Sequence, residues 1–311
     1  MALDKDGYEN IAFERIQNSG QLIGYLKDSK RRLQYSDQVY HYTNVQALCN
    51  IIKNKKWHLS NPKFMNDKLE FDDGDRSVWD RLFYSSFMME DDESIGMWSM
   101  YAQPWETGVK ISFPQKAILN WVNSIDKIYE VSFGVDGSHY TSIYDSTKPY
   151  ISAVAYEGNK KTKKKDSKSK DKESKSGDEI STHPYILKFG TVSNNSFEPI
   201  KRKSTNRELT GYIKDDAWSY EKEVRLKVEF DKNVRYERIA IDIQESVLKE
   251  MVITPSPLFE GDFERIMQGY GVNLKSDNVH IERSRFVDKL NIKTICSSCD
   301  IKKKYSCLNK I

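Results

Sequence analysis

The chain has 311 residues, of which 38% are hydrophobic and 12% aromatic, which is enough apolar material for a packed globular core. The N-terminus lacks the basic start and apolar run of a signal peptide, and no apolar window approaches the ~18 residues that a membrane helix requires. We therefore predict a cytoplasmic protein with no membrane partner. Only four cysteines are present, so nothing indicates an oxidised, disulfide-rich scaffold.

The formal charge of +3 comes from one segment. Residues 160–179 contain nine lysines and five acidic residues, whereas the rest of the chain has 40 basic and 41 acidic residues and is close to neutral. The segment has no large apolar side chain to offset its ordering entropy, so we predict a disordered, lysine-rich insertion at 158–180. Its lysines are either simply solvated or a tether for polyanions, which a salt-dependent affinity would reveal.

The chain opens with apolar positions at helical spacing, and residues 1–36 are predicted to form a helical N-terminal extension. Residues 39–43 are rich in β-branched and aromatic side chains and predict a strand. Thr43 or Asn44 can cap the helix that follows, which should end at the lysine cluster 53–56.

The later segments alternate between period-two and helical spacing without a regular βαβ repeat. We expect strands at 57–60, 82–88, 109–113, 128–135, 185–192, 239–243, 251–254 and 279–286, and helices at 97–102, 114–125 and 259–270. The Tyr- and Ser-rich part at 137–156 has no clear pattern. The prediction is an α+β domain at 37–292 with a mixed, largely antiparallel sheet and flanking helices, followed by a Cys/Lys-rich tail at 293–311.

Residues 217–230 have the cleanest alternation and predict the longest strand. Its apolar side chains share one face, and Glu221, Glu223, Arg225, Lys227 and Glu229 share the other. A water-exposed face of an antiparallel sheet explains this pattern, with Arg225 and Glu223 as an ion pair. Alternatively, Glu221 and Glu223 point into a cleft, where a carboxylate can stabilise the oxocarbenium-like charge that develops when a glycosidic bond breaks.

Other candidate residues have similar structural alternatives. His41, between two tyrosines in the first strand, is either a core or edge histidine or a ligand contact. Trp98 and Tyr101 lie on one side of a short helix and either fill the core or stack on a flat ring. Asp67 and Glu70, three residues apart, fit a helix capping box.

The tail contains Cys296, Cys299 and Cys307, one ligand short of the usual four for zinc. Cys49 or His280 could complete the set if the tail folds back, whereas reduced thiols are the default, so we assign no metal ligand.

Three stretches resemble the bacterial domain-of-unknown-function family 2971. They cover most of residues 40–290 and consist of His41, Tyr42, Thr43, Leu48, Ile51, Ile52, Trp57, Leu59, Ser60, Asn61, Pro62, Asn66, Asp67 and Glu70, then Met97, Trp98, Ser99, Met100, Tyr101, Ala102 and Gly108, then Trp218, Tyr220, Glu221, Glu223 and Arg225. This family name implies organisation and no activity.

A His-x-Thr strand, a helix, a second strand and a distant Glu-x-Glu also resemble the ADP-ribosyltransferase fold. The resemblance implies that Glu223 is the catalytic carboxylate and that Glu221 lies by the acceptor. It further implies that NAD, as the substrate, contacts His41, Tyr42, Thr43, Ser60, Trp98 and Tyr101, with Tyr101 the candidate for stacking on nicotinamide.

The resemblance thus implies a glycosyltransferase that moves ADP-ribose from NAD to an unknown nucleic-acid or protein acceptor, in the manner of a bacterial toxin or phage-defence effector. The alternative is a non-catalytic nucleic-acid- or protein-binding module, in which His41 and the Glu-x-Glu pair are structural. The lysine segment, the cysteine tail and the many aromatic residues favour this alternative.

Overall fold

The computed structural model describes residues 37–64, 79–89, 93–135, 137–143, 146–157, 186–187, 211–275, 279–287 and 289. The predicted N-terminal extension, the capping box, the lysine-rich insertion and the cysteine tail lie outside the described residues. The chain divides into two compact units. The glutamate unit, with Glu221 and Glu223, comprises Met1–Asp37, Trp57–Met89 and Leu119–Asp242; the histidine unit, with His41, comprises Gln38–Lys56, Glu90–Ile118 and Ile243–Ile311.

Four strands of the histidine unit lie in the order β14, β13, β4, β1. Their bounds are β1 Gln38–Asn44, β4 Gly108–Pro114, β13 Val252–Pro255 and β14 His280–Ile281. β4 pairs antiparallel with β1 and with β13, whereas β13 and β14 are parallel. The predicted strand at 279–286 is thus far shorter than expected.

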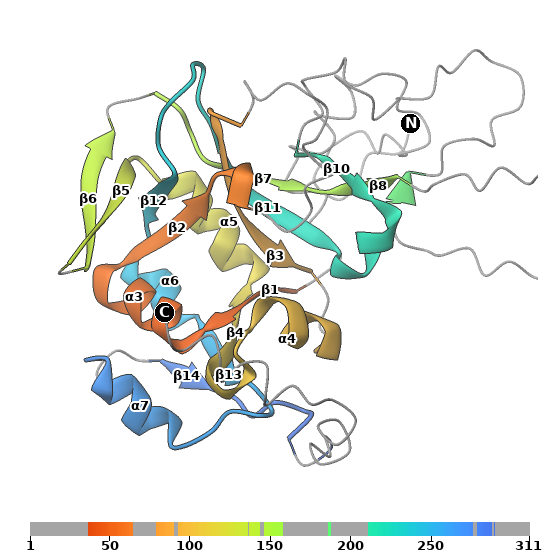
Figure 1. Cartoon of the computed structure of the whole chain (residues 1–311), viewed down its shortest axis with the longest axis vertical. Coiled ribbons are helices and arrows are strands. Elements are labelled where there is room, and N and C mark those ends of the chain that lie inside the picture. The colour runs from red at the N-terminus through yellow and green to blue at the C-terminus, as the bar shows by residue number, and fades with distance from the viewer. Residues whose placement is uncertain are drawn as a thin grey trace, which may run out of the picture. The chain divides into compact units, whose positions relative to one another are not determined.

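Short helices accompany these strands: α3 Val45–Asn54, α4 Ile95–Tyr101, η4 Trp105–Thr107, α6 Glu245–Lys249 and α7 Phe263–Gly269. The side chain of Asn44 accepts a hydrogen bond from the N–H of Ala47 at 2.9 Å, which confirms one of the two predicted caps of α3. α4 lies beside β1 (Figure 1). None of the described helices is long and apolar enough to cross a membrane.

The glutamate unit is built mainly from strands. Their bounds are β2 Lys56–Ser60, β3 Leu82–Met88, β5 Ile128–Gly134, β6 Gly137–Ile143, β7 Tyr150–Ala153, β8 Ala155–Glu157, β9 Ile186–Leu187, β10 Ile213–Asp215, β11 Glu223–Glu229 and β12 Arg238–Asp242. Two 3₁₀ helices, η2 Pro62–Phe64 and η6 Asp216–Glu221, occur among them. The helix α5 Gln115–Ser124 runs from the histidine unit into this one.

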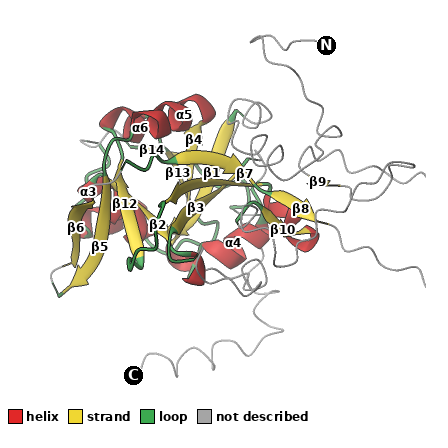
Figure 2. Ribbon diagram, turned by 90° about the horizontal axis from the view of Figure 1, so that it is seen from above, coloured by secondary structure: helices red, strands yellow, loops and turns green. Residues whose placement is uncertain are grey.

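β11 is central to the candidate site because it pairs antiparallel with β3 on one side and β7 on the other. β12, β5 and β6 follow one another as antiparallel neighbours (Figure 2). A separate small sheet has the order β10, β8, β9, and its strands are parallel. The protein is therefore an α+β protein with few helices and largely antiparallel strands, as the sequence predicts.

Aromatic side chains fill the core of the glutamate unit. Trp57 stacks on Phe87 with ring centroids 5.3 Å apart and meets Trp121 edge-on at 5.7 Å. The indole N–H of Trp57 donates to the hydroxyl of Ser85 at 3.0 Å, so its polar atom is also satisfied. This packing joins β2, β3 and α5.

Candidate functional site

The Glu-x-Glu motif does not lie on one continuous strand. η6 ends at Glu221, Lys222 has a left-handed backbone with φ of 43°, and β11 begins only at Glu223. Such geometry costs a non-glycine residue about 1–3 kcal/mol and interrupts the alternation of side chains along the chain. The prediction of a strand over 217–230 is therefore wrong in its first half.

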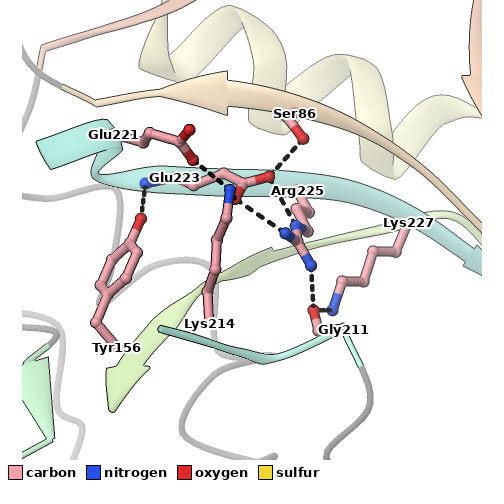
Figure 3. Close-up of polar contacts among 8 residues, drawn as sticks. All are labelled: Ser86, Tyr156, Gly211, Lys214, Glu221, Glu223, Arg225 and Lys227. Atoms are coloured by element: carbon pink, nitrogen blue, oxygen red, sulfur yellow. Dashed lines mark hydrogen bonds and ion pairs between the residues drawn. The ribbon is translucent and has the colours of Figure 1, made fainter. Parts of the chain in front are cut away.

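Lys214 in β10 brings the two glutamates together (Figure 3). Its ammonium group lies 2.5 Å from Oε2 of Glu221 and 3.4 Å from Oε2 of Glu223. The same group lies 4.6 Å from the centre of the Trp218 ring. The two carboxylates thus converge as the sequence suggests, but a buried lysine and a backbone kink produce the convergence, not strand alternation.

Arg225 forms a bidentate ion pair with Glu223. Its Nε lies 2.7 Å from Oε1 of the carboxylate, and its Nη2 lies 2.9 Å from Oε2. Ser86, which faces Arg225 in the β3–β11 register, also donates its hydroxyl to Oε1. The N–H of Glu223 donates to the hydroxyl of Tyr156 at 2.8 Å. The ion pair that the sequence suggested as a structural alternative is therefore present, and both oxygens of Glu223 accept hydrogen bonds.

Opposing effects determine the charge of Glu223. Burial raises the pKa of its carboxyl, but the charges of Arg225 and Lys214 and the hydrogen bonds from Arg225 and Ser86 lower it, and the balance leaves a pKa of about 2. Burial also raises the pKa of Tyr156, whose hydroxyl stays protonated. Glu223 is consequently an anion at any physiological pH.

Gly211 supplies a backbone anchor for the basic side chains. Its carbonyl accepts hydrogen bonds from Nη1 of Arg225, at 3.1 Å, and from the ammonium group of Lys227 (Figure 3). Its φ of +74° lies in the region that favours glycine, and an added Cβ would lie 3.0 Å from Cδ2 of Leu82. Lys227 also contacts the ring of Tyr212, with its ammonium group 3.4 Å from the centroid.

The charged side chains of β11 are buried except for the half-buried Glu229 at its end, which contradicts the predicted water-exposed face. Arg225 is 1% exposed and Lys227 is fully buried. We call the set of Ser86, Tyr156, Gly211, Lys214, Glu221, Glu223, Arg225 and Lys227 the glutamate network (Figure 3). Sequence reasoning missed Ser86, Tyr156, Gly211 and Lys214, because no local pattern marks them and only the tertiary structure brings them to the charged side chains of β11.

The other predicted substrate contacts divide between faces and units. His41, Tyr42 and Thr43 are successive residues of β1, so Tyr42 points to one face of its sheet and the other two point to the opposite face. Tyr42 packs edge-on against Trp98, with ring centroids 4.9 Å apart. Tyr101, at the end of α4, is half-buried.

Ser60 belongs to the glutamate unit, where it faces Tyr84 across β2 and β3. His41, Tyr42, Thr43, Trp98 and Tyr101 belong to the histidine unit. The implied contact of one NAD molecule with His41, Tyr101 and Glu223 therefore stays a prediction.

Within the described ranges, no group of three or more His, Cys, Asp or Glu side chains is arranged to hold a metal ion. Cys49 is buried in α3, where burial raises the pKa of its thiol to about 11. The zinc alternative in the tail lies outside the described residues.

A family described as "Protein of unknown function (DUF2971)" has a model that matches residues 97–226. The matched segment includes Trp98, Tyr101, Glu221 and Glu223, which supports the resemblance to this family. No curated protein and no solved structure matches the chain.

Proposed function

We propose that the protein is an ADP-ribosyltransferase-like enzyme that cleaves the nicotinamide glycosidic bond of NAD and transfers ADP-ribose to a macromolecular acceptor. Glu223 is its catalytic carboxylate, and Glu221 serves the acceptor. The biological role that goes with this proposal is that of a toxin or phage-defence effector. The proposal includes an ADP-ribosyltransferase-like arrangement of the strands.

One observation carries the proposal: Glu223 is a fixed anion at the end of a strand, next to a second carboxylate on the same lysine. Breaking the bond between ribose and nicotinamide develops positive charge on the sugar ring. A carboxylate that is already ionised and oriented stabilises this charge without reorganising during the reaction. The contacts of Arg225 and Ser86 supply that orientation for Glu223.

The hydroxyl of Ser86 suggests how a sugar would engage the carboxylate. It donates to Oε1 of Glu223, which is the interaction that a ribose hydroxyl makes with a catalytic glutamate. In the proposed complex a ribose hydroxyl replaces the Ser86 hydroxyl as a donor to Oε1. Nη2 of Arg225 continues to donate its hydrogen bond to Oε2. The ammonium group of Lys214 fixes the position of the Glu221 carboxylate, and this carboxylate orients or deprotonates the acceptor.

The decisive experiment measures nicotinamide release from NAD by the full chain and by Glu223→Gln. Loss of one preorganised electrostatic contact typically lowers turnover by on the order of a hundredfold or more. Because Glu223→Gln also leaves Arg225 without its buried anion and Lys214 with Glu221 alone, it is expected to destabilise the fold by about 3–5 kcal/mol. Turnover must therefore be expressed per folded molecule, with the folded fraction measured by circular dichroism.

Arg225→Gln is the matched comparison, because it breaks the same ion pair and keeps the carboxylate. Since Arg225 also orients that carboxylate, we expect its turnover per folded molecule to fall, but by less than that of Glu223→Gln. The proposal is wrong if the wild-type protein releases no nicotinamide from NAD, or if both variants lose activity only in proportion to their loss of folded protein.

A second function is favoured by the saturation of Glu223. Ser86, Arg225 and Lys214 occupy both carboxylate oxygens, and the side chain is only 4% exposed. In a non-catalytic nucleic-acid- or protein-binding module the glutamate network would simply fix the position of β11. Salt-sensitive binding of nucleic acid without cleavage of NAD would favour this function over the enzyme.

A further inference from the structure

The strand β6 forms a long, accessible edge of the glutamate unit. It pairs with β5 along all seven of its residues, and no other described strand pairs with it. It lies outermost beside β5 in both views of the chain (Figure 1, Figure 2). Four of its residues are exposed and the other three are half-buried. The outer side of this strand is therefore open to another strand.

The turn of the β5–β6 hairpin determines which backbone groups point to the open edge. Gly134 and Gly137 face one another across a turn of two residues, and a hydrogen-bonded pair closes such a turn. From there, every second pair along the two strands exchanges hydrogen bonds. The residues between these pairs, Ser138, Tyr140 and Ser142, consequently direct their backbone N–H and C=O groups away from β5.

The sequence of β6 lacks the features with which proteins usually protect an exposed edge. Such strands are commonly very short, or carry proline, lysine or another charged residue. β6 contains no proline, lysine, arginine, aspartate or glutamate, although 31% of the chain is charged. By contrast, β14 at the edge of the histidine unit has only two residues, and β7, which pairs with β11, is buried at three of its four positions.

The strand is also complementary to a second copy of itself. Its outward-facing residues are symmetric about Tyr140, so a two-fold axis at Tyr140 pairs all seven residues with those of the partner strand in antiparallel register. Ser138 then stands opposite Ser142 of the partner subunit. All three outward-facing residues enter hydrogen-bonded pairs, and no like charges meet across the contact.

We propose that β6 pairs with β6 of a second copy of this chain and joins two glutamate units into one continuous antiparallel sheet. Phe133, which is 64% exposed and faces Ser138 on β5, adds apolar surface next to this edge. The pairing does not depend on the function proposed above. It rests on the exposure, the register and the neutral sequence of β6.

Sedimentation of the full chain over a range of concentrations tests the pairing. We expect a dimer that dissociates on dilution, because one strand from each copy makes a small interface. Hydrogen–deuterium exchange of residues 137–143 should become slower as the dimer forms, since the outward-facing N–H groups then donate to the partner subunit.

Two double variants at the same positions test the register. Ser138→Lys combined with Ser142→Lys places a lysine opposite a lysine at two points of the contact and should weaken dimerisation about tenfold at low salt. Ser138→Lys combined with Ser142→Glu is the matched control, because each lysine then faces a glutamate of the other copy. This control should dimerise at least as tightly as the wild type, and circular dichroism verifies that both double variants are folded.

Three results would each overturn the pairing. They are a wild-type chain that stays monomeric at its highest soluble concentration, a dimer in which exchange of residues 137–143 is not slowed, and equal dimerisation of the two double variants. Release of nicotinamide from NAD by the wild type is a separate readout, so the enzyme proposal and the pairing can fail independently.

Discussion

The glutamate network and the polar side chains of Glu93, Trp98 and Thr254 in the histidine unit are both buried, yet their polar atoms differ in how far they are paired. In the glutamate network, Lys214, Glu221, Glu223, Arg225 and Lys227 all have a hydrogen-bond or ion-pair partner. In the histidine unit, Glu93, Trp98 and Thr254 each keep one buried atom without a hydrogen-bond partner among the described residues, and that atom of Glu93 has only a long ion pair with Lys110, at 3.9 Å.

This difference separates two uses of buried polarity. A saturated network fixes the positions of the strands that supply it, and removal of one member leaves a charge buried without its partner. A buried polar atom without a hydrogen-bond partner loses its hydration and gains nothing in return, so its removal costs little. Substitutions in the two places should therefore differ in their effect on stability.

The largest effect on stability is expected for Arg225→Met, which removes the bidentate ion-pair partner of Glu223. We expect the free energy of unfolding to fall by about 3–5 kcal/mol, because the carboxylate stays buried with only part of its compensation. Urea denaturation measures this change. Arg235→Met, at an exposed position, should stay within about 0.5 kcal/mol of the wild type. An equally small change in Arg225→Met would show that the network is not saturated in solution.

The next effect concerns pH, through His58 of the glutamate unit. Burial and the charge of Arg238 lower the pKa of His58 to about 4, from about 6.5 in an unfolded chain. The folded state favours the neutral imidazole. The contribution of His58 to the free energy of unfolding is therefore complete above pH 6.5 and is lost as the pH falls toward 4. The free energy of unfolding should be about 2 kcal/mol lower at pH 5 than at pH 7.5.

His58→Gln should remove most of this decrease in the free energy of unfolding between pH 7.5 and pH 5.

Glu223 affects the free energy of unfolding at lower pH, because its pKa of about 2 lies below the usual 4.5. Its contribution is complete above pH 4.5 and is lost as the pH falls through 2. Stability that stays constant from pH 7.5 to 5 in the wild type would contradict the buried, neutral state of His58.

Gly211→Ala probes the backbone anchor of the network with a smaller change. A positive φ and the contact with Leu82 disfavour a side chain at this position, and we expect a loss of about 1–2 kcal/mol. Gly269→Ala is its counterpart at the end of α7, where an added Cβ meets nothing within 4 Å. That control should be neutral or gain up to about 1 kcal/mol in a denaturation series. Equal effects of the two substitutions would argue against the anchor.

The smallest effect is expected for Thr254→Val. It removes an orphaned hydroxyl and keeps the shape of the side chain, so stability should change by less than about 0.5 kcal/mol or rise. Ser112→Ala in the same unit removes a hydroxyl that donates to the carbonyl of Val252, and should cost about 1 kcal/mol. If Thr254→Val costs more than Ser112→Ala in thermal denaturation, the Thr254 hydroxyl has a partner and the comparison fails.

Local patterns were sufficient for several elements. The strand at 82–88 was predicted with the bounds that β3 has, and the spacing of apolar residues together with Asn44 predicted α3, because periodicity and capping depend on neighbours in the chain. The segment 137–156 had no assignment, yet it forms β6, β7 and most of β8. No single period runs through this segment, because β6 is largely exposed whereas β7 is buried at Ile151, Ser152 and Ala153.

The sequence by itself determined that Glu221 and Glu223 are a pair and that Arg225 could neutralise one of them. Only the tertiary structure decided that the pair is buried. Ser86 of β3 reaches Glu223 from 137 residues away in the chain, and Lys214 of β10 and the carbonyl of Gly211 reach β11 from the segment that precedes η6. Alternation specifies which side chains share a face, but whether water or another segment covers that face depends on long-range packing, which carries no signal in the sequence of the strand.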